Sequence, residues 1–204
     1  GCGWGCWMNI TGKAAKRSGR QVKLIGIEGD TEHIKYAEEA LRTNGFTEEE
    51  QLLHRGIAGH SDGFALFPVK ESGTENWGLE PVFDPDLTQY ERLISEGKYE
   101  KLKVFGISDL LPNDTIIDLL HIDIQGGELD FVEKSLEQLT KRVGYMLIGT
   151  HSRTIEGNLL ELLIEAGWIL EVERPAIIEL KSIQPQTLVD GVQAWRNNNL
   201  TGKD

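Results

Sequence analysis

Hydrophobic and polar residues follow one another along the chain in blocks whose periods predict strands and helices in turn. The clearest block is the apolar run from Ile116 to Ile122, whose Ile and Leu content is typical of a strand buried on both faces of a parallel sheet. Asp123 ends this run, and a helix is predicted from Leu129 to Leu139, where apolar residues recur at helical spacing. Ligands bind at the carboxyl ends of strands in open α/β sheets, so Asp123 is a candidate site residue. An Asp here could instead cap the helix.

The same patterns predict the other elements. Strands are expected over 22–27, 52–58, 64–68, 104–107, 143–149, 168–173 and 187–195, and helices over 7–18, 32–43 and 154–166. The strands at 52–58 and 64–68 are expected to pair as a hairpin, and the last two strands to be joined through a proline-containing loop. This alternation of strands and helices predicts a three-layer α/β sheet.

The chain length predicts one domain. With 204 residues, the whole of 1–204 can form a single core, interrupted by a loop-rich insertion at about 69–101. That insertion contains Gly, Pro and Asn together with Trp77, Phe83, Tyr90 and Tyr99. Two interpretations stay open: the aromatic side chains pack the insertion onto the core, or the insertion is a lid over a substrate.

Charge and composition narrow the possible partners. There are 21 basic and 33 acidic residues, a net charge of −12, which argues against binding to nucleic acid. No apolar run approaches membrane-spanning length, so no membrane partner is expected. Cys2 and Cys6 are interpreted as small packing residues of a protein in a reducing, cytoplasmic setting.

A glycine-rich stretch opens the chain. Gly1-Cys2-Gly3-Trp4-Gly5 precedes the first predicted helix, and since a strand normally precedes such a loop, we expect that this strand is missing from the chain as given. Glu28 ends the next strand 23 residues after Gly5, an interval that lets a carboxylate bind both ribose hydroxyls of a nucleotide. Nicotinamide dinucleotides and S-adenosylmethionine are both bound in this way. The dinucleotide fingerprint requires a third glycine where Cys6 stands, so the glycine spacing separates the two cofactors only weakly.

Four segments together resemble one protein family. They are Gly1–Gly5, Ile25–Glu28, the stretch Ile117–Glu128 with its I-D-x-L-x-I-D-x-x-G-x-E motif, and Ile148–Ser152. The combination is similar to the FkbM family of S-adenosylmethionine-dependent methyltransferases. The resemblance implies a Rossmann-like class I methyltransferase fold, with a seven-stranded, mostly parallel sheet whose last strand is antiparallel. It also implies O-methylation of a hydroxyl on a sugar or another small molecule.

The resemblance also implies roles for individual residues. The cofactor loop would be shaped by Gly1, Gly3 and Gly5, and the carboxylate of Glu28 would hold the ribose. Ala58 would lie near the adenine, and Asp123 would face the methionine part or the methyl acceptor.

Methyl transfer to a hydroxyl requires a base, because an alcohol is a poor nucleophile until its proton leaves. Asp123 and His151 are the catalytic candidates, since both follow neighbouring predicted strands and imidazole titrates near neutral pH. His151 could instead orient Glu156 or cap the helix that follows. Asp123, Glu128 and His151 could gather a divalent cation, but their spacing does not require one, and we expect no metal. Glu128 is explained by the preference of carboxylates for the first turn of a helix.

Two other functions are compatible with parts of the sequence. An NAD-dependent oxidoreductase would need the third glycine and usually a further parallel unit, whereas this chain closes with two adjacent strands. A non-catalytic nucleotide-binding module would keep Glu28 and the glycine loop but would not need Asp123 or His151. The sequence specifies neither the methyl acceptor nor the oligomeric state.

Overall fold

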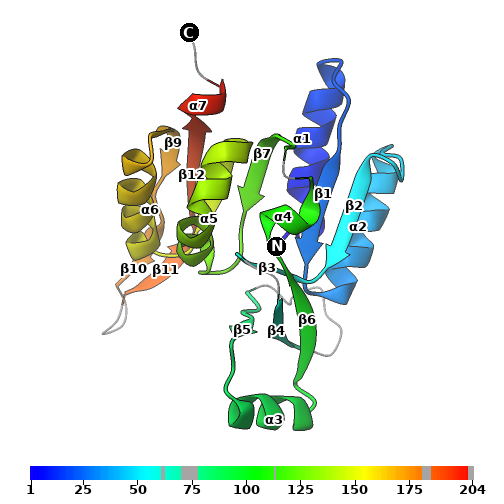
Figure 1. Cartoon of the computed structure of the whole chain (residues 1–204), viewed down its shortest axis with the longest axis vertical. Helices are drawn as coiled ribbons and strands as arrows, with labels where there is room; N and C mark the ends of the chain where they lie inside the picture. The colour runs from blue at the N-terminus through cyan, green and yellow to red at the C-terminus, as the bar shows by residue number, and fades with distance from the viewer. Residues whose placement is uncertain (61–62, 70–77, 113, 181–184, 202–204) are drawn as a thin grey trace. The chain divides into compact units, whose positions relative to one another are not determined.

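We describe a computed structural model of the chain over residues 1–60, 63–69, 78–112, 114–180 and 185–201. The chain separates into two compact units, Gly1–Leu110 and Leu111–Asp204, and each is described by itself (Figure 1). The predicted seven-stranded sheet would draw its strands from both units, so neither unit contains it alone.

The first part of unit 1 is a parallel strand pair with two helices. Its elements are α1 (Cys6–Arg17), β1 (Leu24–Glu28), α2 (Thr31–Thr43) and β2 (Gln51–Arg55), with β1 parallel to β2. Asp30 caps α2 by accepting hydrogen bonds from the amides of Glu32 and His33, so the helix begins one residue earlier than predicted. Buried Met8, Leu41 and Phe46 pack between the helices and strands. The predicted strand–helix–strand order is confirmed here.

The second part of unit 1 is a mixed sheet. It contains β3 (Ile57–Ala58), β4 (Gly63–Pro68), β5 (Val82–Phe83) and β6 (Tyr99–Phe105), in the order β3-β6-β4-β5, and it is followed by α4 (Ile107–Leu110). The predicted hairpin between 52–58 and 64–68 is wrong, because β4 pairs with β5 and β6 instead. The reason lies in β6, whose alternating side chains bury Leu102 and Val104 against Ile57, Ala65 and Phe67.

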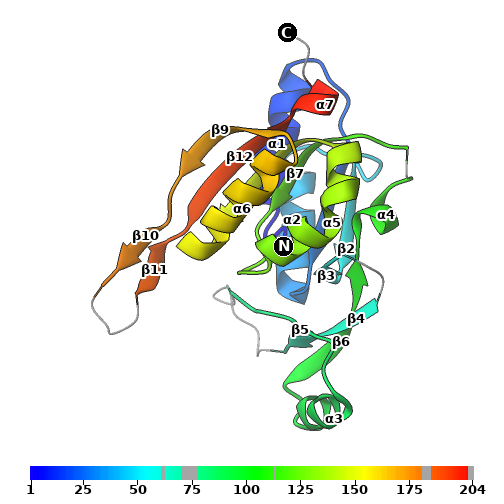
Figure 2. The same cartoon turned by 60° about the vertical axis from the view of Figure 1, so that its left-hand side comes forward.

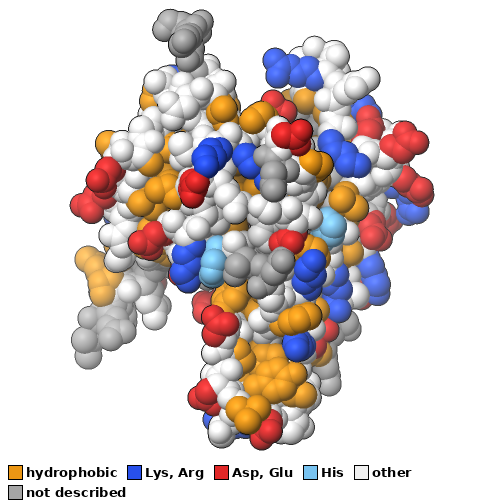
Figure 3. Space-filling view, viewed as in Figure 1, with side chains coloured by type: hydrophobic (Ala, Val, Ile, Leu, Met, Phe, Trp, Pro, Cys, Tyr) orange, Lys and Arg blue, Asp and Glu red, His pale blue; other side chains and the backbone are white. Residues whose placement is uncertain are grey.

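The stretch 69–101 is more regular than the sequence suggested. It holds β5, the helix α3 (Leu87–Ser95) and the start of β6, and Asp86 caps α3 by accepting from the amide of Gln89. The part from 70 to 77, with Trp77, lies outside the described residues. Hydrophobic side chains gather on the surface around α3 and β6, in the lower part of Figure 3, where Phe64 and Leu87 are mostly exposed.

Unit 2 is a four-stranded sheet with two helices packed side by side against it (Figure 2). The strands are β7 (Ile117–Ile122), β8 (Val143–Thr150), β9 (Trp168–Arg174) and β12 (Gly191–Asn197), in the order β7-β8-β12-β9; the helices are α5 (Glu128–Arg142), α6 (Arg153–Glu165) and the short α7 (Asn198–Thr201). β7 and β8 are parallel, whereas β12 runs antiparallel to both β8 and β9. The antiparallel last strand is therefore confirmed.

The core of unit 2 lies between the helices and this sheet. Its fully buried side chains come from α5, α6 and the two central strands: Val132, Leu139, Val143, Met146, Ile148, Leu159, Leu163 and Trp195. β7 is the outer strand in the described order, and its Asp118 and Leu119 are exposed. The prediction that this strand is buried on both faces is therefore wrong for Asp118 and Leu119, because only one side of β7 is paired within the unit.

A two-stranded ribbon projects from one end of unit 2 (Figure 2). It pairs β10 (Ile177–Glu179) with β11 (Gln186–Val189) in antiparallel fashion. β10 lies in the connection that the sequence predicted to be a proline-containing loop, whereas β11 falls largely within the strand predicted at 187–195. That prediction of one continuous strand is wrong, because the structure divides it into β11 and β12. None of the helices in the described parts of the chain is long and apolar enough to cross a membrane.

Candidate functional site

The glycine-rich stretch forms a tight loop beside β1. The amide of Cys2 donates to the carbonyl of Ile27 over 2.8 Å, and the amide of Gly5 closes a turn on the carbonyl of Cys2 over 2.9 Å. Gly3 and Gly5 have φ angles of +52° and +73°, a region that glycine occupies without steric cost. Gly5 is also the N-cap residue of α1. The loop therefore places successive backbone groups at the start of a helix, and the cofactor role of Gly1, Gly3 and Gly5 stays a prediction.

Glu28 joins this loop to the end of β1. Its Oε2 accepts from the amide of Gly3 over 2.8 Å, and its Oε1 accepts from the amide of Asp30 over 3.1 Å. The ring Nδ1 of His33 lies 4.0 Å from Oε1. A carboxylate has about four acceptor positions, so these two backbone hydrogen bonds leave positions for two hydroxyl groups. The structure thus brings together Gly3 and Glu28, two of the predicted cofactor residues.

Ala58 lies in β3, where it pairs with Phe105 of β6. The chain reaches this position through Gly56, whose amide donates to the carbonyl of Glu28 over 3.0 Å. A Cβ at Gly56 would lie 2.5 Å from the Phe105 ring, so only glycine allows this turn. The turn positions Ala58 two residues beyond the contact with β1, within unit 1.

Asp123 and His151 meet at the carboxyl ends of β7 and β8 in unit 2. These strands are parallel neighbours, and Nε2 of His151 lies 3.4 Å from Oδ1 of Asp123. Oδ2 of Asp190 lies 3.9 Å from the same nitrogen. The expectation that Asp123 and His151 stand at neighbouring strand ends is confirmed, because the carboxyl ends of parallel strands share one edge of a sheet.

The alternatives weighed for these two residues do not hold. The N-cap of α5 is Gly127, so Asp123 does not cap that helix. The helix after His151 is capped by Ser152, whose Oγ accepts from the amide of Ile155. Glu156 is bound by Thr150, whose hydroxyl donates to it over 2.9 Å.

Glu128 is the residue whose contacts the sequence did not reveal. It is the first residue of α5, it is completely buried, and its Oε1 lies 2.9 Å from Nδ1 of His151. Its carboxylate also accepts from the amides of Ile124 and Gly126. A preference for the first helical turn explains a carboxylate at this position but not its burial. The sequence signal that could have indicated this contact is the I-D-x-L-x-I-D-x-x-G-x-E motif, which places Glu128 directly after the turn that follows Asp123.

This arrangement shifts the protonation of both partners. The hydrogen bond to the Glu128 carboxylate raises the pKa of His151, which burial opposes and the charges of Glu128, Asp123 and Asp190 reinforce. Burial raises the pKa of Glu128, but the hydrogen bond and the charge of His151 together with backbone hydrogen bonds outweigh burial, so the pKa lies below its usual value. The pair is therefore an imidazolium–carboxylate ion pair in the acidic range, and the imidazole loses its proton at a higher pH than usual.

Asp123, Glu128 and His151 are also close enough to share a cation. Each offers one ligand atom, and these atoms lie within 4.8 Å of one another. Carboxylate oxygens and imidazole nitrogen suit several divalent metals. Our expectation that no metal is needed stays a prediction.

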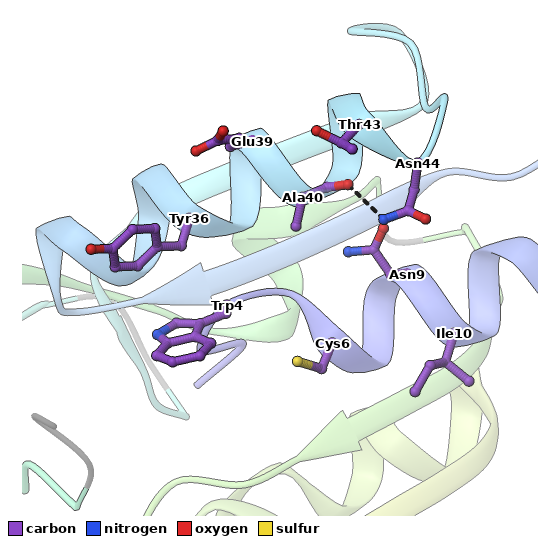
Figure 4. Close-up of a pocket in the computed structure, with 9 residues that line it drawn as sticks. All are labelled: Trp4, Cys6, Asn9, Ile10, Tyr36, Glu39, Ala40, Thr43 and Asn44. Carbon is purple, nitrogen blue, oxygen red and sulfur yellow. Dashed lines mark hydrogen bonds between the residues drawn. The ribbon is translucent and has the colours of Figure 1, made fainter. Parts of the chain in front are cut away.

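Two further features lie apart from these groups. Burial lowers the pKa of His121, inside β7, to about 4. An open, mostly apolar groove of about 680 Å³ lies along α1 and α2 in unit 1 (Figure 4). Its lining includes Trp4, Cys6 and Tyr36, so the groove borders the glycine-rich loop, although neither Gly3 nor Glu28 lines it.

The sequence has a relative over almost its whole length. The chain is 44% identical over 197 residues to a protein of Jannaschia sp. (strain CCS1) that is named as a methyltransferase, and the match covers 97% of this chain and 70% of the relative. No family model matches the chain, so its resemblance to the FkbM family stays a prediction.

Two solved structures of methyltransferases show a weak likeness to the chain. Precorrin-6y C5,15-methyltransferase from Geobacter metallireducens GS-15 has a TM-score of 0.47 and 11% identity, covering 96% of this chain and 76% of that chain. The N-terminal domain of human METTL16 in complex with SAH has a TM-score of 0.44 and 16% identity, covering 97% and 59%.

Because these structural likenesses are weak, the assignment rests on the sequence relative together with the strand arrangement. The order β7-β8-β12-β9, with an antiparallel last strand inserted next to a parallel pair, agrees with the Rossmann-like α/β fold of class I methyltransferases. The chain belongs to the methyltransferase family that the Jannaschia relative represents.

Proposed function

We propose that this protein is an S-adenosylmethionine-dependent O-methyltransferase of the FkbM type that acts on a hydroxyl group of a sugar or another small molecule. The observation that carries the choice of oxygen as acceptor is the position of His151, whose Nε2 faces Asp123 at the strand ends of unit 2. A hydroxyl acceptor needs a base at such a position, whereas a neutral amine does not.

The residues of unit 1 fit a nucleoside. Glu28 keeps acceptor positions for both ribose hydroxyls, and the backbone around Gly3 and Gly5 carries no side chain that would fill the loop. Ala58 follows Gly56 and would contact the adenine. When bound there, S-adenosylmethionine supplies a methyl group on a positively charged sulfur. The net charge of −12 favours a cationic cofactor and disfavours a nucleic acid acceptor.

In unit 2, His151 would take the proton of the acceptor hydroxyl at Nε2. Transfer would join the acceptor oxygen to the methyl carbon that the cofactor supplies, and the electron pair of the broken carbon–sulfur bond would stay on sulfur. The products are a methyl ether and a neutral thioether, and His151 holds the proton until water removes it. Asp123 would contact the acceptor or the methionine part of the cofactor and stabilise the imidazolium, since its Oδ1 lies 3.4 Å from Nε2.

The rest of the proposal concerns the whole chain. Residues 1–204 would act as one methyltransferase domain, with the stretch 69–101 contributing to acceptor choice. The free thiols of Cys2 and Cys6 are compatible with the reducing, cytoplasmic setting that the composition predicts.

Calorimetric titration tests the cofactor. We expect S-adenosylmethionine and S-adenosylhomocysteine to bind and NAD to give no heat, and binding of NAD alone would overturn the proposal. Transfer of a labelled methyl group is then measured with matched alcohol and amine acceptors. Label recovered only as a methyl ether supports O-methylation, whereas label recovered on nitrogen contradicts it.

A further inference from the structure

The buried carboxylate of Glu128 has a role that the proposed chemistry does not yet include. Its side chain is 0% exposed, and a buried carboxylate without partners would be strongly destabilising. Here it has partners on two sides: the turn after β7, and the ring of His151 after β8. Glu128 therefore joins the two strand ends that carry the candidate catalytic residues.

On the first side, Glu128 fixes the turn that carries Asp123. Its Oε1 accepts from the amide of Ile124 over 2.9 Å, and its two oxygens accept from the amide of Gly126 over 3.2 and 3.1 Å. The turn is unusual, because Gln125 and Gly126 both have positive φ angles, +57° and +100°. The side-chain amide of Gln125 donates to Oδ1 of Asp123 over 3.0 Å. The carboxylate thus stabilises a strained backbone and, through it, the position of Asp123.

On the second side, Glu128 determines which ring nitrogen of His151 is available. Nδ1 lies 2.9 Å from Oε1 of Glu128, a close charged contact that falls outside hydrogen-bond geometry in this structure. Because a carboxylate can only accept, this contact favours a hydrogen on Nδ1. In the neutral ring Nε2 is then the basic nitrogen. Nε2 faces Asp123 at 3.4 Å and Asp190 at 3.9 Å; the Asp190 side chain is 60% exposed and that of His151 is 16% exposed.

We propose that Glu128 is a positioning residue for His151: it holds the Nδ1–H tautomer and the ring orientation that direct Nε2 toward the acceptor hydroxyl. The proposal rests on the proposed function, since it assumes that His151 is the base. It goes beyond that function by assigning the most deeply buried acid of the motif a part in proton transfer. Glu128 does not touch the reacting atoms.

Nuclear magnetic resonance of the imidazole nitrogens tests this tautomer directly. The five histidines of the chain can be separated by comparing the wild type with His151→Asn. We expect neutral His151 to be protonated at Nδ1 in the wild type and to become a mixture of tautomers in Glu128→Gln. A wild-type His151 protonated mainly at Nε2 overturns the proposal, and this result does not require any variant of Glu128 to fold.

Glu156→Gln is the matched control. Glu156 is also a buried acid of unit 2, 3% exposed, but it binds Thr150 and the amide of Ala176 instead of an imidazole. Both substitutions remove one buried negative charge. We expect only Glu128→Gln to change the tautomer of His151, and equal changes in both variants would mean a general structural effect.

The kinetic test uses the plateau at high pH, where His151 is neutral in every variant. Loss of a correctly directed base lowers kcat by about 10²-fold or more. We expect such a fall in Glu128→Gln, with the KM for S-adenosylmethionine nearly unchanged, and a much smaller fall in Glu156→Gln. An unchanged plateau kcat in folded Glu128→Gln contradicts the proposal. If the wild type itself transfers no methyl group, the proposed function fails, while the tautomer measurement still decides whether Glu128 positions the ring.

Discussion

The amide of Gly3 donates a hydrogen bond to Oε2 of Glu28 over 2.8 Å, so the glycine loop and the end of β1 are joined although 25 residues separate them. This bond orients the carboxylate along the loop and leaves its remaining acceptor positions facing away from the amide. It also means that Glu28 supports the loop as well as a ligand. Substitutions of Glu28 therefore need a measurement of stability beside each measurement of binding.

We predict that Glu28→Ala weakens the binding of S-adenosylmethionine at least tenfold. A hydrogen bond to a charged group contributes about 1.5–3 kcal/mol, and about 1.4 kcal/mol corresponds to a factor of ten. Calorimetric titration measures the change. Glu32→Ala is the control, because Glu32 forms an exposed ion pair with Lys35 and should leave the affinity unchanged. Equal affinities for Glu28→Ala and the wild type would remove Glu28 from the cofactor site.

We predict that Gly5→Ala destabilises the protein more than Gly19→Ala. Both glycines have φ angles near +80°, where an alanine costs roughly 1–2 kcal/mol. A Cβ at Gly5 would also lie 3.3 Å from the Cβ of Ala37, whereas a Cβ at Gly19 meets nothing within 4 Å. Denaturant unfolding of the two variants compares the free energies. Equal decreases in the free energy of unfolding would show that the contact between Gly5 and Ala37 adds no steric penalty and that the glycine loop is not closely packed.

Several elements could be predicted because their signals are local. The strand β1, the pair β7 and β8, and the helix α5 between these two strands follow from apolar periods. The pairing of β4 with β6 could not be predicted in the same way, since it joins residues 31 to 41 positions apart in sequence, from Pro68 with Tyr99 to Gly63 with Val104. The alternation around Leu102 and Val104 was a strand signal, but the loop-like composition before it obscured that signal.

In the candidate site, too, one contact could be predicted from the sequence and another could not. Asp123 and His151 could be placed together because the rule for parallel strands needs only the strand assignments. The contact between Glu128 and His151 could not, because it depends on the turn at Gln125 and Gly126, where positive φ angles direct the start of α5 back toward β8. The position of Glu128 in the first turn of a helix already explained a carboxylate there, so nothing in the sequence was a reason to expect a contact with His151.

We predict that methyl transfer does not need a divalent cation. Glu128 already accepts two backbone amides and contacts His151, so its oxygens are engaged without a metal. Dialysis against a chelator should leave kcat unchanged, and added Mg²⁺ or Mn²⁺ should not raise it. The expectation would be contradicted if chelation removed the activity and Mg²⁺ restored it in the wild type but not in Asp123→Asn. That result would indicate a metal site formed by Asp123, Glu128 and His151.

The last prediction concerns pH. The contact with Glu128 raises the pKa of His151, so the base form appears only as the pH rises through that raised value. We expect kcat to increase with pH to a plateau, with its midpoint above the ordinary value for histidine. In Glu128→Gln the midpoint should move to lower pH, because the largest cause of the shift is gone, while Glu156→Gln should keep the wild-type midpoint.

The same pKa shift determines how His151 contributes to stability. Because the folded state binds the proton more tightly than the unfolded state, the contribution is fully present below the unfolded pKa and is lost as the pH rises through the folded pKa. The free energy of unfolding lost in His151→Asn should therefore be largest below the unfolded pKa of histidine and should shrink above neutral pH. Within that range Glu128 must stay ionised, which its lowered pKa favours. Denaturant unfolding of both proteins at a series of pH values measures the difference, and a loss that grows with pH would contradict the ion pair between Glu128 and His151.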